Sequence, residues 1–333
     1  MLNFNFFLGI DASKDFANVA LLSGASPKKY KDFKFDQAAN GFKSFLKWLL
    51  QQSKNDLSKL FVCVEHTGIY IVEICNFLEE HEISYTLISP IALKRSLGLQ
   101  RGKSDKVDAR RIATYAFKNR DDLPIHRLAT ADLRELQALV TYRKRLQKSL
   151  QAIRISAKEL ALVETFGSVA HISADSERIT KELAESMKQV EQKILALIDT
   201  CQDIKKKFDI IKTVPGVGWL TAISFIIYTQ NFVAFTNPRK FACYAGTAPF
   251  EHSSGSSIRG KTGVSQMANK KMKTLLTTSA WSAINHYSEF SDYFNKKVDK
   301  KGKNKFSVLN AIRNKIIHRV FAVVRKNKAY VPA

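Results

Sequence analysis

The sequence has 333 residues, of which 53 are Lys or Arg and 30 are Asp or Glu, so its formal net charge is +23. This length is enough for two or three domains of roughly 100 to 200 residues each. The charge favours a polyanionic partner, which by charge alone is DNA, RNA or an acidic membrane.

The hydropathy pattern argues against the membrane. The longest apolar run, residues 219–228, has about half of the roughly 20 residues that a membrane-spanning helix needs. The N-terminal stretch leads directly into Asp11 without a basic region, so it does not resemble a signal peptide. We therefore expect a cytoplasmic protein with no membrane partner.

Strands and helices are predicted to alternate over residues 1–125. Apolar, β-prone stretches predict strands at residues 4–10, 16–22, 30–35, 60–64 and 85–88. Helical periodicity predicts helices at residues 42–50 and 69–80, and a proline at position 90 is expected to end the last strand. Strands that first form a meander and then alternate with helices indicate an α/β fold.

Long helices with little Gly or Pro are predicted for residues 126–209. The spacings of apolar residues alternate between four and three, which predicts a coiled-coil seam of under three heptads through Leu183, Met187, Val190, Ile194, Leu197 and Cys201. The segment 165–176 is expected to turn the chain into a helical hairpin, which would serve as a spacer or a dimerisation arm. Arg143 and Lys144 lie in a basic stripe that either faces solvent or follows a phosphate backbone.

Residues 210–333 are predicted to be mostly helical. Gly216 and Gly218 lie between two apolar helical patterns and resemble a helix-hairpin-helix, in which backbone N–H groups face a phosphate. The alternative is a plain turn between two helices. Basic residues crowd the last helices, among them Lys296, Lys297, Lys300, Lys301, Lys303 and Lys305.

Four carboxylates form the first candidate site. Asp105 and Asp108 are three residues apart at the start of a predicted helix, where they share one face or only cap the helix. Asp11 and Glu65 each end an apolar strand, and neighbouring strands of one sheet would bring them to the same edge. Oxygen ligands of this kind suit Mg²⁺, with Mn²⁺ as the alternative ion. Asp15, in the following turn, is a weaker substitute.

The second candidate site is the Gly- and Ser-rich segment 245–263. It contains a histidine at position 252 beside Ser253 and Ser254, and it supplies Arg259 and Lys261 as phosphate clamps. The alternative is a flexible surface loop, because serine needs a base, metal or cation to become a nucleophile. No clear Ser-His-Asp order is present.

Five ordered motifs resemble the DEDD-type insertion-sequence transposases related to the Piv DNA invertases, a family of bridge-RNA-guided recombinases. The resemblance spans nearly the whole chain. The motifs are Gly9-Ile10-Asp11 with Ser13-Lys14, Glu65-x-Thr67-Gly68-x-Tyr70, Lys103-Ser104-Asp105-x-x-Asp108-Ala109, Val214-Pro215-Gly216-Val217-Gly218, and Ala245-Gly246-x-x-Pro249 followed by Ser254-Gly255.

The resemblance implies a RuvC-like, ribonuclease-H-type domain at residues 1–125, with Asp11, Glu65, Asp105 and Asp108 as Mg²⁺ ligands. It implies a helical coiled-coil hairpin at 126–209 and a transposase domain at 210–333, whose serine forms a transient phosphoserine link with DNA. By motif position this serine is Ser254, with Ser253 as the alternative.

Partners follow from the same resemblance. A structured noncoding RNA would pair with donor and target DNA, and the two domains of different protomers would combine within a dimer or tetramer. Lys103, Arg259, Lys261 and Lys273 are expected among the nucleic-acid contacts. Where the family often has Gly-Asn and then an arginine, this chain has Ala268-Asn269 and Lys273, and lysine cannot reproduce bidentate arginine contacts.

Two other functions compete with this interpretation. The first is a metal-dependent junction nuclease, in which water attacks the phosphate and the serine segment is structural. The second is a scaffold that binds nucleic acid without catalysis.

Overall fold

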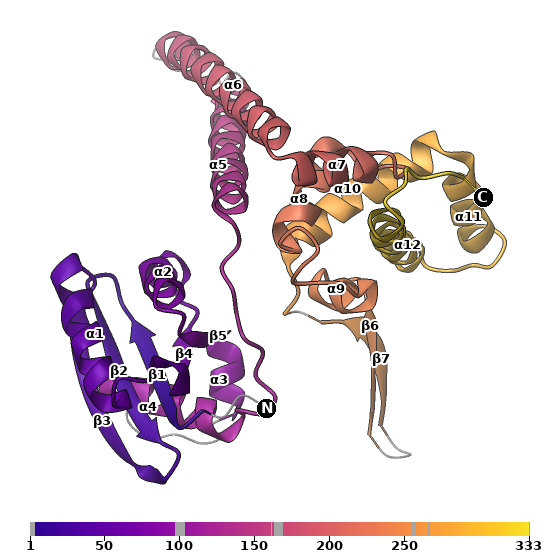
Figure 1. Cartoon of the computed structure of the whole chain (residues 1–333). Helices are drawn as coiled ribbons and strands as arrows, with labels where there is room; N and C mark the ends of the chain where they lie inside the picture. The colour runs from indigo at the N-terminus through magenta and orange to yellow at the C-terminus, as the bar shows by residue number, and fades with distance from the viewer. Residues whose placement is uncertain are drawn as a thin grey trace. The chain divides into compact units, whose positions relative to one another are not determined.

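The computed structural model describes residues 4–96, 104–160, 162, 169–254, 258–265 and 267–332, with the backbone alone at 27, 251–254 and 258–262. The chain forms two compact units, Met1–Leu128 and Ala129–Ala333 (Figure 1). Each unit has its own hydrophobic core. The predicted three-domain division stays a prediction, since the second unit contains both the long helices and the C-terminal ones.

A five-stranded mixed sheet in the order β3-β2-β1-β4-β5 forms the centre of the first unit. The first three strands form an antiparallel meander, and β4 and β5 continue the sheet parallel to β1. This confirms the predicted hairpin, third strand and later strands. The strands are β1 (Phe6–Ala12), β2 (Phe16–Ser23), β3 (Ser26–Asp36), β4 (Leu60–Glu65) and β5 (Ser84–Ile88).

Helices cover both faces of this sheet. Because side chains alternate along a strand, Leu8 and Ile10 of β1 pack with α1 and α2 on one face, while Phe7 packs with α3 and α4 on the other. The proline at position 90 begins α3, as its fixed φ allows at a first helical position. The bounds are α1 (Ala39–Ser53), α2 (Val72–Glu80) after a 3₁₀ turn at Gly68–Ile71, α3 (Pro90–Ser96) and α4 (Asp105–Lys118).

Gly9 lets α4 lie directly on β1. A Cβ atom at this position would overlap the carbonyl oxygen of Ala109 and the backbone nitrogen of Ala113. Any other residue would therefore push the helix away from the strand, and overpacking of this kind is destabilising. The glycine of the Gly9-Ile10-Asp11 motif thus has a packing role, two residues before the candidate carboxylate.

Two long helices, α5 (Ala131–Leu160) and α6 (Val169–Thr200), begin the second unit. They pack side by side, and the predicted seam residues of α6 lie in or against the core of this unit (Figure 1). The predicted pair of packed helices is confirmed, and its coiled-coil geometry stays a prediction. The predicted turn at residues 165–176 is wrong for its second part, because α6 already begins at Val169, and residues 165–168 lie outside the described residues.

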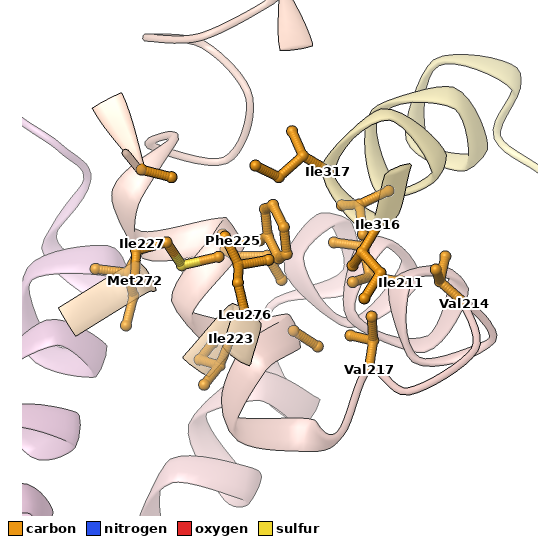
Figure 2. Packing of buried hydrophobic residues seen from close by; sticks show 14 of the residues in the cluster. Ile211, Val214, Val217, Ile223, Phe225, Ile227, Met272, Leu276, Ile316 and Ile317 are labelled. Atoms are coloured by element: carbon orange, nitrogen blue, oxygen red, sulfur yellow. The ribbon is translucent and has the colours of Figure 1, made fainter. Parts of the chain in front are cut away.

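Most of the remaining helices pack around α8, whereas α11 packs against α10 and α12. All residues from Thr221 to Ile227 are buried, and Figure 2 shows Phe225 among side chains from α7, α10 and α12. Among the described residues, no helix has the length and apolar character needed to cross a membrane. The bounds are α7 (Gln202–Lys212), α8 (Trp219–Tyr228), α9 (Pro238–Tyr244), α10 (Lys270–His286), α11 (Ser288–Val298) and α12 (Lys305–Lys326).

The Gly- and Ser-rich segment is not simply a loop. It forms an antiparallel hairpin of β6 (Pro249–Ser254) and β7 (Ile258–Val264). Side chains from the helices hold its base: Asn310 donates a hydrogen bond from Nδ2 to the carbonyl oxygen of Thr247, at 2.7 Å. The backbone N–H of Asn269 donates to the carbonyl oxygen of Tyr244, also at 2.7 Å.

Candidate active site

Asp11 and Glu65 lie at the same level of adjacent strands. Ile10 pairs with Val64 in the parallel β1–β4 ladder, so Asp11 and Glu65 are the next residues along the two strands. Both side chains are half-buried. As predicted, the sheet brings these two carboxylates to one edge.

Both carboxylates belong to the sheet face that α4 covers. Phe7 of β1 and Cys63 of β4 are buried against α4, and alternation along each strand puts Asp11 and Glu65 on that same face. Burial raises the pKa of the Cys63 thiol to about 12, and the negative charge of Glu65 contributes to this shift. The Glu65 carboxylate is therefore near the Cys63 side chain.

Helix α4 runs antiparallel to β1. The rings of Phe7 and Phe117 meet edge to face with centroids 5.2 Å apart, whereas Gly9 faces Ala109, which lies about two turns nearer the start of the helix. The residues of β1 that follow Phe7 therefore lie beside residues progressively nearer the N-terminus of α4.

The first turn of α4 consequently lies at the level of Asp11. Two residues of strand rise about 6.6 Å, a height that roughly four or five helical residues span at about 1.5 Å each. Asp11 lies two residues beyond Gly9, which places it beside the turn that carries Asp105 and Asp108. All four predicted carboxylates thus belong to one end of one face of the first unit.

The two helical acids have different local surroundings. Asp105 begins the stripe that continues with the buried residues Ala109 and Ile112, and it is exposed beyond the covered part of the sheet. Asp108 is half-buried and forms an ion pair with Arg111 at 2.7 Å. The cap of the helix is Ser104, whose Oγ accepts a hydrogen bond from the Val107 N–H at 3.4 Å, so capping does not occupy either acid.

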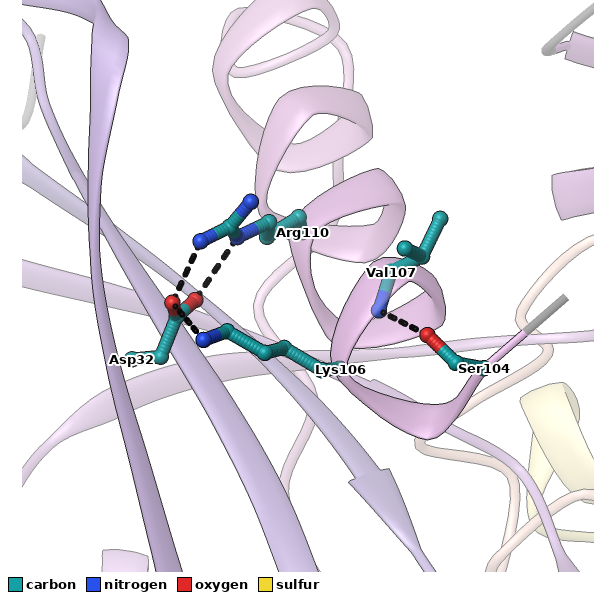
Figure 3. A network of polar contacts seen from close by, with 5 residues as sticks. All are labelled: Asp32, Ser104, Lys106, Val107 and Arg110. Carbon is teal, nitrogen blue, oxygen red and sulfur yellow. Dashed lines mark hydrogen bonds and ion pairs between the residues drawn. The ribbon is translucent and has the colours of Figure 1, made fainter. Parts of the chain in front are cut away.

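Asp32 of β3 fixes the start of α4 on the sheet, a contact that the sequence did not predict. Its carboxylate accepts hydrogen bonds from Arg110 Nε at 2.8 Å and Nη2 at 2.5 Å, and Lys106 Nζ lies 3.0 Å away (Figure 3). Bidentate Arg–carboxylate pairs are among the stronger polar contacts. Asp32 therefore positions the helical turn that carries Asp105 and Asp108.

We expect Asp32→Asn to lower the stability of the first unit at pH 7 by about 1 kcal/mol, a modest value because Arg110 and Lys106 are partly exposed. Hydrogen bonding to Arg110 is the main cause that holds the pKa of Asp32 below its ordinary value of 3.8, with Lys106 adding to the shift. The ionised form is thus favoured in the folded state. Its contribution is complete above 3.8 and is lost as the pH falls through the lowered folded-state pKa.

Melting temperatures from pH 7 down to pH 2 check this expectation. The wild type should melt above Asp32→Asn at pH 7, and the two curves should converge in acid. Asp36→Asn changes an exposed acid at the end of the same strand and serves as the control. A difference between wild type and Asp32→Asn that stayed constant with pH would show that Asp32 does not act through its charge.

The donor chemistry of the four carboxylates fits a hard divalent cation, because all four supply oxygen ligands. Within the part of the chain that the structure describes, no three His, Cys, Asp or Glu side chains are grouped closely enough to hold a metal. Asp108, in particular, is directed to Arg111. The structure therefore brings the four acids to one region without assembling them into a ligand set.

Ser254 belongs to the second unit, as the last residue of β6. Its backbone pairs with Ile258 of β7, and Ser253 pairs with Arg259. The side chains of Ser254, Arg259 and Lys261 lie outside the described part of the structure, as does the whole of Lys103, and their roles stay predictions.

The two predicted phosphate-contacting glycines differ in their surroundings. Gly216 has φ +77°, and a Cβ atom there would overlap the carbonyl oxygen of Ser279 on α10, so this glycine is needed for packing. Gly218 is the N-cap of α8, and a Cβ atom there would meet nothing within 4 Å. The turn between α7 and α8 therefore leaves Gly218 more open than Gly216 to a phosphate.

The basic residues of α5 also differ. Arg143 donates a hydrogen bond to Glu191 of α6 at 2.6 Å and lies over the Trp219 ring at 5.3 Å from its centroid, so it contributes to packing within the unit. Burial lowers the pKa of Lys144, and the charges of Lys271 and Lys148 lower it further. Lys144 thus belongs to a group of lysines drawn from α5 and α10, whereas Arg143 already has a protein partner. Contact of either with nucleic acid stays a prediction.

The acid-bearing strand ends, the acidic first turn of α4 and the strong positive charge are features expected of a DEDD-type DNA-processing enzyme. Residues 8–166 match the family model of the IS110-type DEDD transposases, described as "Transposase". Residues 208–295 match the model described as "Transposase IS116/IS110/IS902 family". The chain belongs to this transposase family and is a DNA transposase or recombinase.

Relatives agree with this assignment. The pilin gene-inverting protein of Moraxella bovis is 24% identical over 328 residues, which cover 97% of each chain. The transposase for insertion sequence element IS1111A of Coxiella burnetii is 24% identical over 273 residues, 73% of this chain and 72% of the relative. The family resemblance predicted from the five motifs is therefore confirmed.

Proposed function

We propose that this chain is the transposase of an insertion sequence and that it cuts and rejoins DNA through a transient phosphoserine at Ser254. The observation that carries the proposal is the placement of Asp11, Glu65, Asp105 and Asp108 at one end of one sheet face, in a chain that matches transposase models in both units. The strand order, with a meander followed by parallel strands, supports the assignment of residues 1–125 as a RuvC-like domain.

The four carboxylates would hold Mg²⁺, or Mn²⁺ in its place. A divalent ion bound to such residues supplies charge stabilisation at the scissile phosphate and lowers the pKa of a bound hydroxyl group. The sheet supplies Asp11 and Glu65 from rigid strand ends. Helix α4 supplies Asp105 and Asp108 from a turn whose position depends on Asp32.

The covalent step conserves phosphodiester bonds. The Ser254 Oγ forms a bond to the scissile phosphorus while the bond from phosphorus to a sugar oxygen breaks. The proton lost by the serine ends on the departing sugar hydroxyl. Attack by the sugar hydroxyl of another strand on the phosphoserine releases Ser254 and restores a phosphodiester, so no external energy source is required.

Recognition of the DNA is assigned to a structured noncoding RNA. Base pairing between such an RNA and the DNA would select the sequence, so the protein needs contacts mainly to backbones. The net charge of +23 and the lysines shared by α5 and α10 support this division of labour. The helices α5 and α6, within the proposed hairpin of residues 126–209, would join protomers into a dimer or tetramer, with residues 210–333 as the transposase domain.

The test is recombination in vitro with purified protein, donor DNA, target DNA, the noncoding RNA encoded beside the gene, and Mg²⁺. Recombinant junctions, measured by quantitative amplification, should appear in the complete reaction. They should be lost when either the RNA or Mg²⁺ is omitted. Junctions that form at full yield without RNA would remove the guide from the proposal, and nicked DNA without junctions would favour the junction nuclease.

A further inference from the structure

Arg313 of α12 is a buried cation that has no acidic partner among the described residues. Only 9% of its surface is exposed, and its Nε makes no hydrogen bond. Its Nη1 lies 3.4 Å from Asn310 Oδ1, a neutral acceptor. Burial alone lowers the pKa of Arg313, so no carboxylate among the described residues compensates its charge.

The position of Arg313 in the helix makes this burial costly. Leu309, Ile312, Ile316 and Ile317 are all fully buried, and Arg313 interrupts the apolar stripe that they form. A buried guanidinium without an ion partner is destabilising, and an apolar side chain of similar size would pack better here. Apart from its contact with Asn310, the described part of the protein offers nothing that compensates the buried charge of Arg313.

Lys273 of α10 is the second cation of this region. Burial lowers its pKa, and the positive charge of Arg313 lowers it further, which places the two cations in the same region. As at Arg313, no carboxylate of the described chain contributes to the pKa of Lys273. Two desolvated cations side by side would be compensated by an anion.

The base of the β6–β7 hairpin lies beside both cations. A Cβ atom built on Gly246 would lie 3.6 Å from Lys273 Cδ, and Gly246 has φ +67°, a conformation that favours glycine. Asn310, which contacts Arg313, also donates the hydrogen bond to Thr247. The turn before β6 is therefore bounded by Lys273 on one helix and by Arg313 with Asn310 on another.

We propose that Arg313 and Lys273 bind one backbone phosphate of a nucleic-acid strand at the base of the hairpin that carries Ser254. A guanidinium offers forked donors to phosphate oxygens, and a lysine adds a point charge. Ser254 is five residues beyond Pro249, about 16 Å along an extended strand, so this phosphate differs from the reacting one. Arg313 and Lys273 are thus positioning residues. Phosphate binding by these residues is independent of the proposed function. Only the assignment of that phosphate to a DNA or RNA strand rests on it.

The first experiment measures thermal unfolding of the full chain with inorganic phosphate, against chloride at equal ionic strength. Phosphate should raise the melting temperature of the wild type by about 2–4 °C at saturating concentration. Arg313→Met should lose this rise, yet melt at or above the wild type in chloride because an uncompensated buried charge is gone. Arg325→Met, at the exposed end of the same helix, is the matched control and should keep the rise.

The second experiment measures binding of duplex DNA and of a structured RNA by fluorescence anisotropy over a range of salt. Arg313→Met should weaken binding about tenfold and reduce the salt slope by about one, for the nucleic acid whose phosphate occupies the site. The nucleic acid whose binding changes, DNA or RNA, is the one whose phosphate occupies the site.

Two results overturn the proposal: a phosphate effect that persists in Arg313→Met, or binding of both nucleic acids that is unchanged. A purely structural Arg313 would instead give a variant that melts below the wild type. If Arg313→Met does not fold, Lys273→Met decides by the same two measurements. Neither measurement depends on recombination. A protein that is inactive in recombination but still shows the phosphate effect would contradict the proposed function and leave the proposal for this site intact.

Discussion

Asp11→Asn is expected to abolish DNA cleavage and recombination, with a loss of roughly 10³-fold or more. Asp11 is the only candidate ligand on the central strand β1. It lies at the same level of the sheet as Glu65 and the first turn of α4. Asparagine preserves the shape of the side chain and removes its charge, so a divalent ion held by the proposed site would lose one anionic ligand. Strand cleavage of labelled DNA, followed over time with Mg²⁺, measures the effect.

A second readout separates metal binding from catalysis. Mg²⁺ should raise the melting temperature of the wild type, because an ion that binds only the folded state stabilises it. Asp11→Asn should lose this rise and melt near the wild type without Mg²⁺, since Asp11 is half-buried at the end of its strand. Asp15→Asn, an exposed acid in the next turn, should keep both activity and the Mg²⁺ effect. Equal losses in both variants would exclude Asp11 as the specific ligand.

The carboxylate region was predictable because its signals are local. Each strand is an apolar run that ends near an acid, and the acidic turn begins a periodic helix. The parallel pairing of β1 with β4 then follows from the alternation of strands and helices, which puts Asp11 beside Glu65. Gly9 completes the arrangement by admitting α4 onto β1.

Asp32 was missed for a physical reason. Its partner Arg110 is 78 residues away in the sequence, and no periodicity links a polar residue of β3 to one side of a later helix. Only the assembled sheet brings the two together. The pairing is thus a property of the tertiary structure, although it sets the position of the acidic turn.

The hairpin of β6 and β7 was missed because its composition opposes strand formation. Glycine and serine have low β-propensity, so the segment indicates a loop. One contact at its base comes from Asn310, which is 63 residues beyond Thr247, so no local pattern could reveal it. Arg313 did carry a signal, since a basic residue at an apolar position of a helical stripe marks a buried charge.

Ser254→Ala is expected to eliminate the covalent protein–DNA adduct and to reduce recombination by about 10⁴-fold or more, because no other group replaces a nucleophile. The reaction is stopped with denaturant in the presence of Mg²⁺, and labelled DNA that migrates with the protein is measured on a denaturing gel. DNA binding should stay within about twofold of the wild type, since a single hydroxyl contributes little to a contact dominated by backbone charge.

Ser253→Ala is the matched control, because it removes the same hydroxyl group from the adjacent residue. The two serines are neighbours on β6, where their backbones pair with different residues of β7. If Ser254 is the nucleophile, Ser253→Ala should still form the adduct. If Ser253→Ala abolishes the adduct and Ser254→Ala does not, Ser253 is the nucleophile. If both variants still nick DNA at the wild-type rate without an adduct, water is the nucleophile, and the carboxylates act as a nuclease centre.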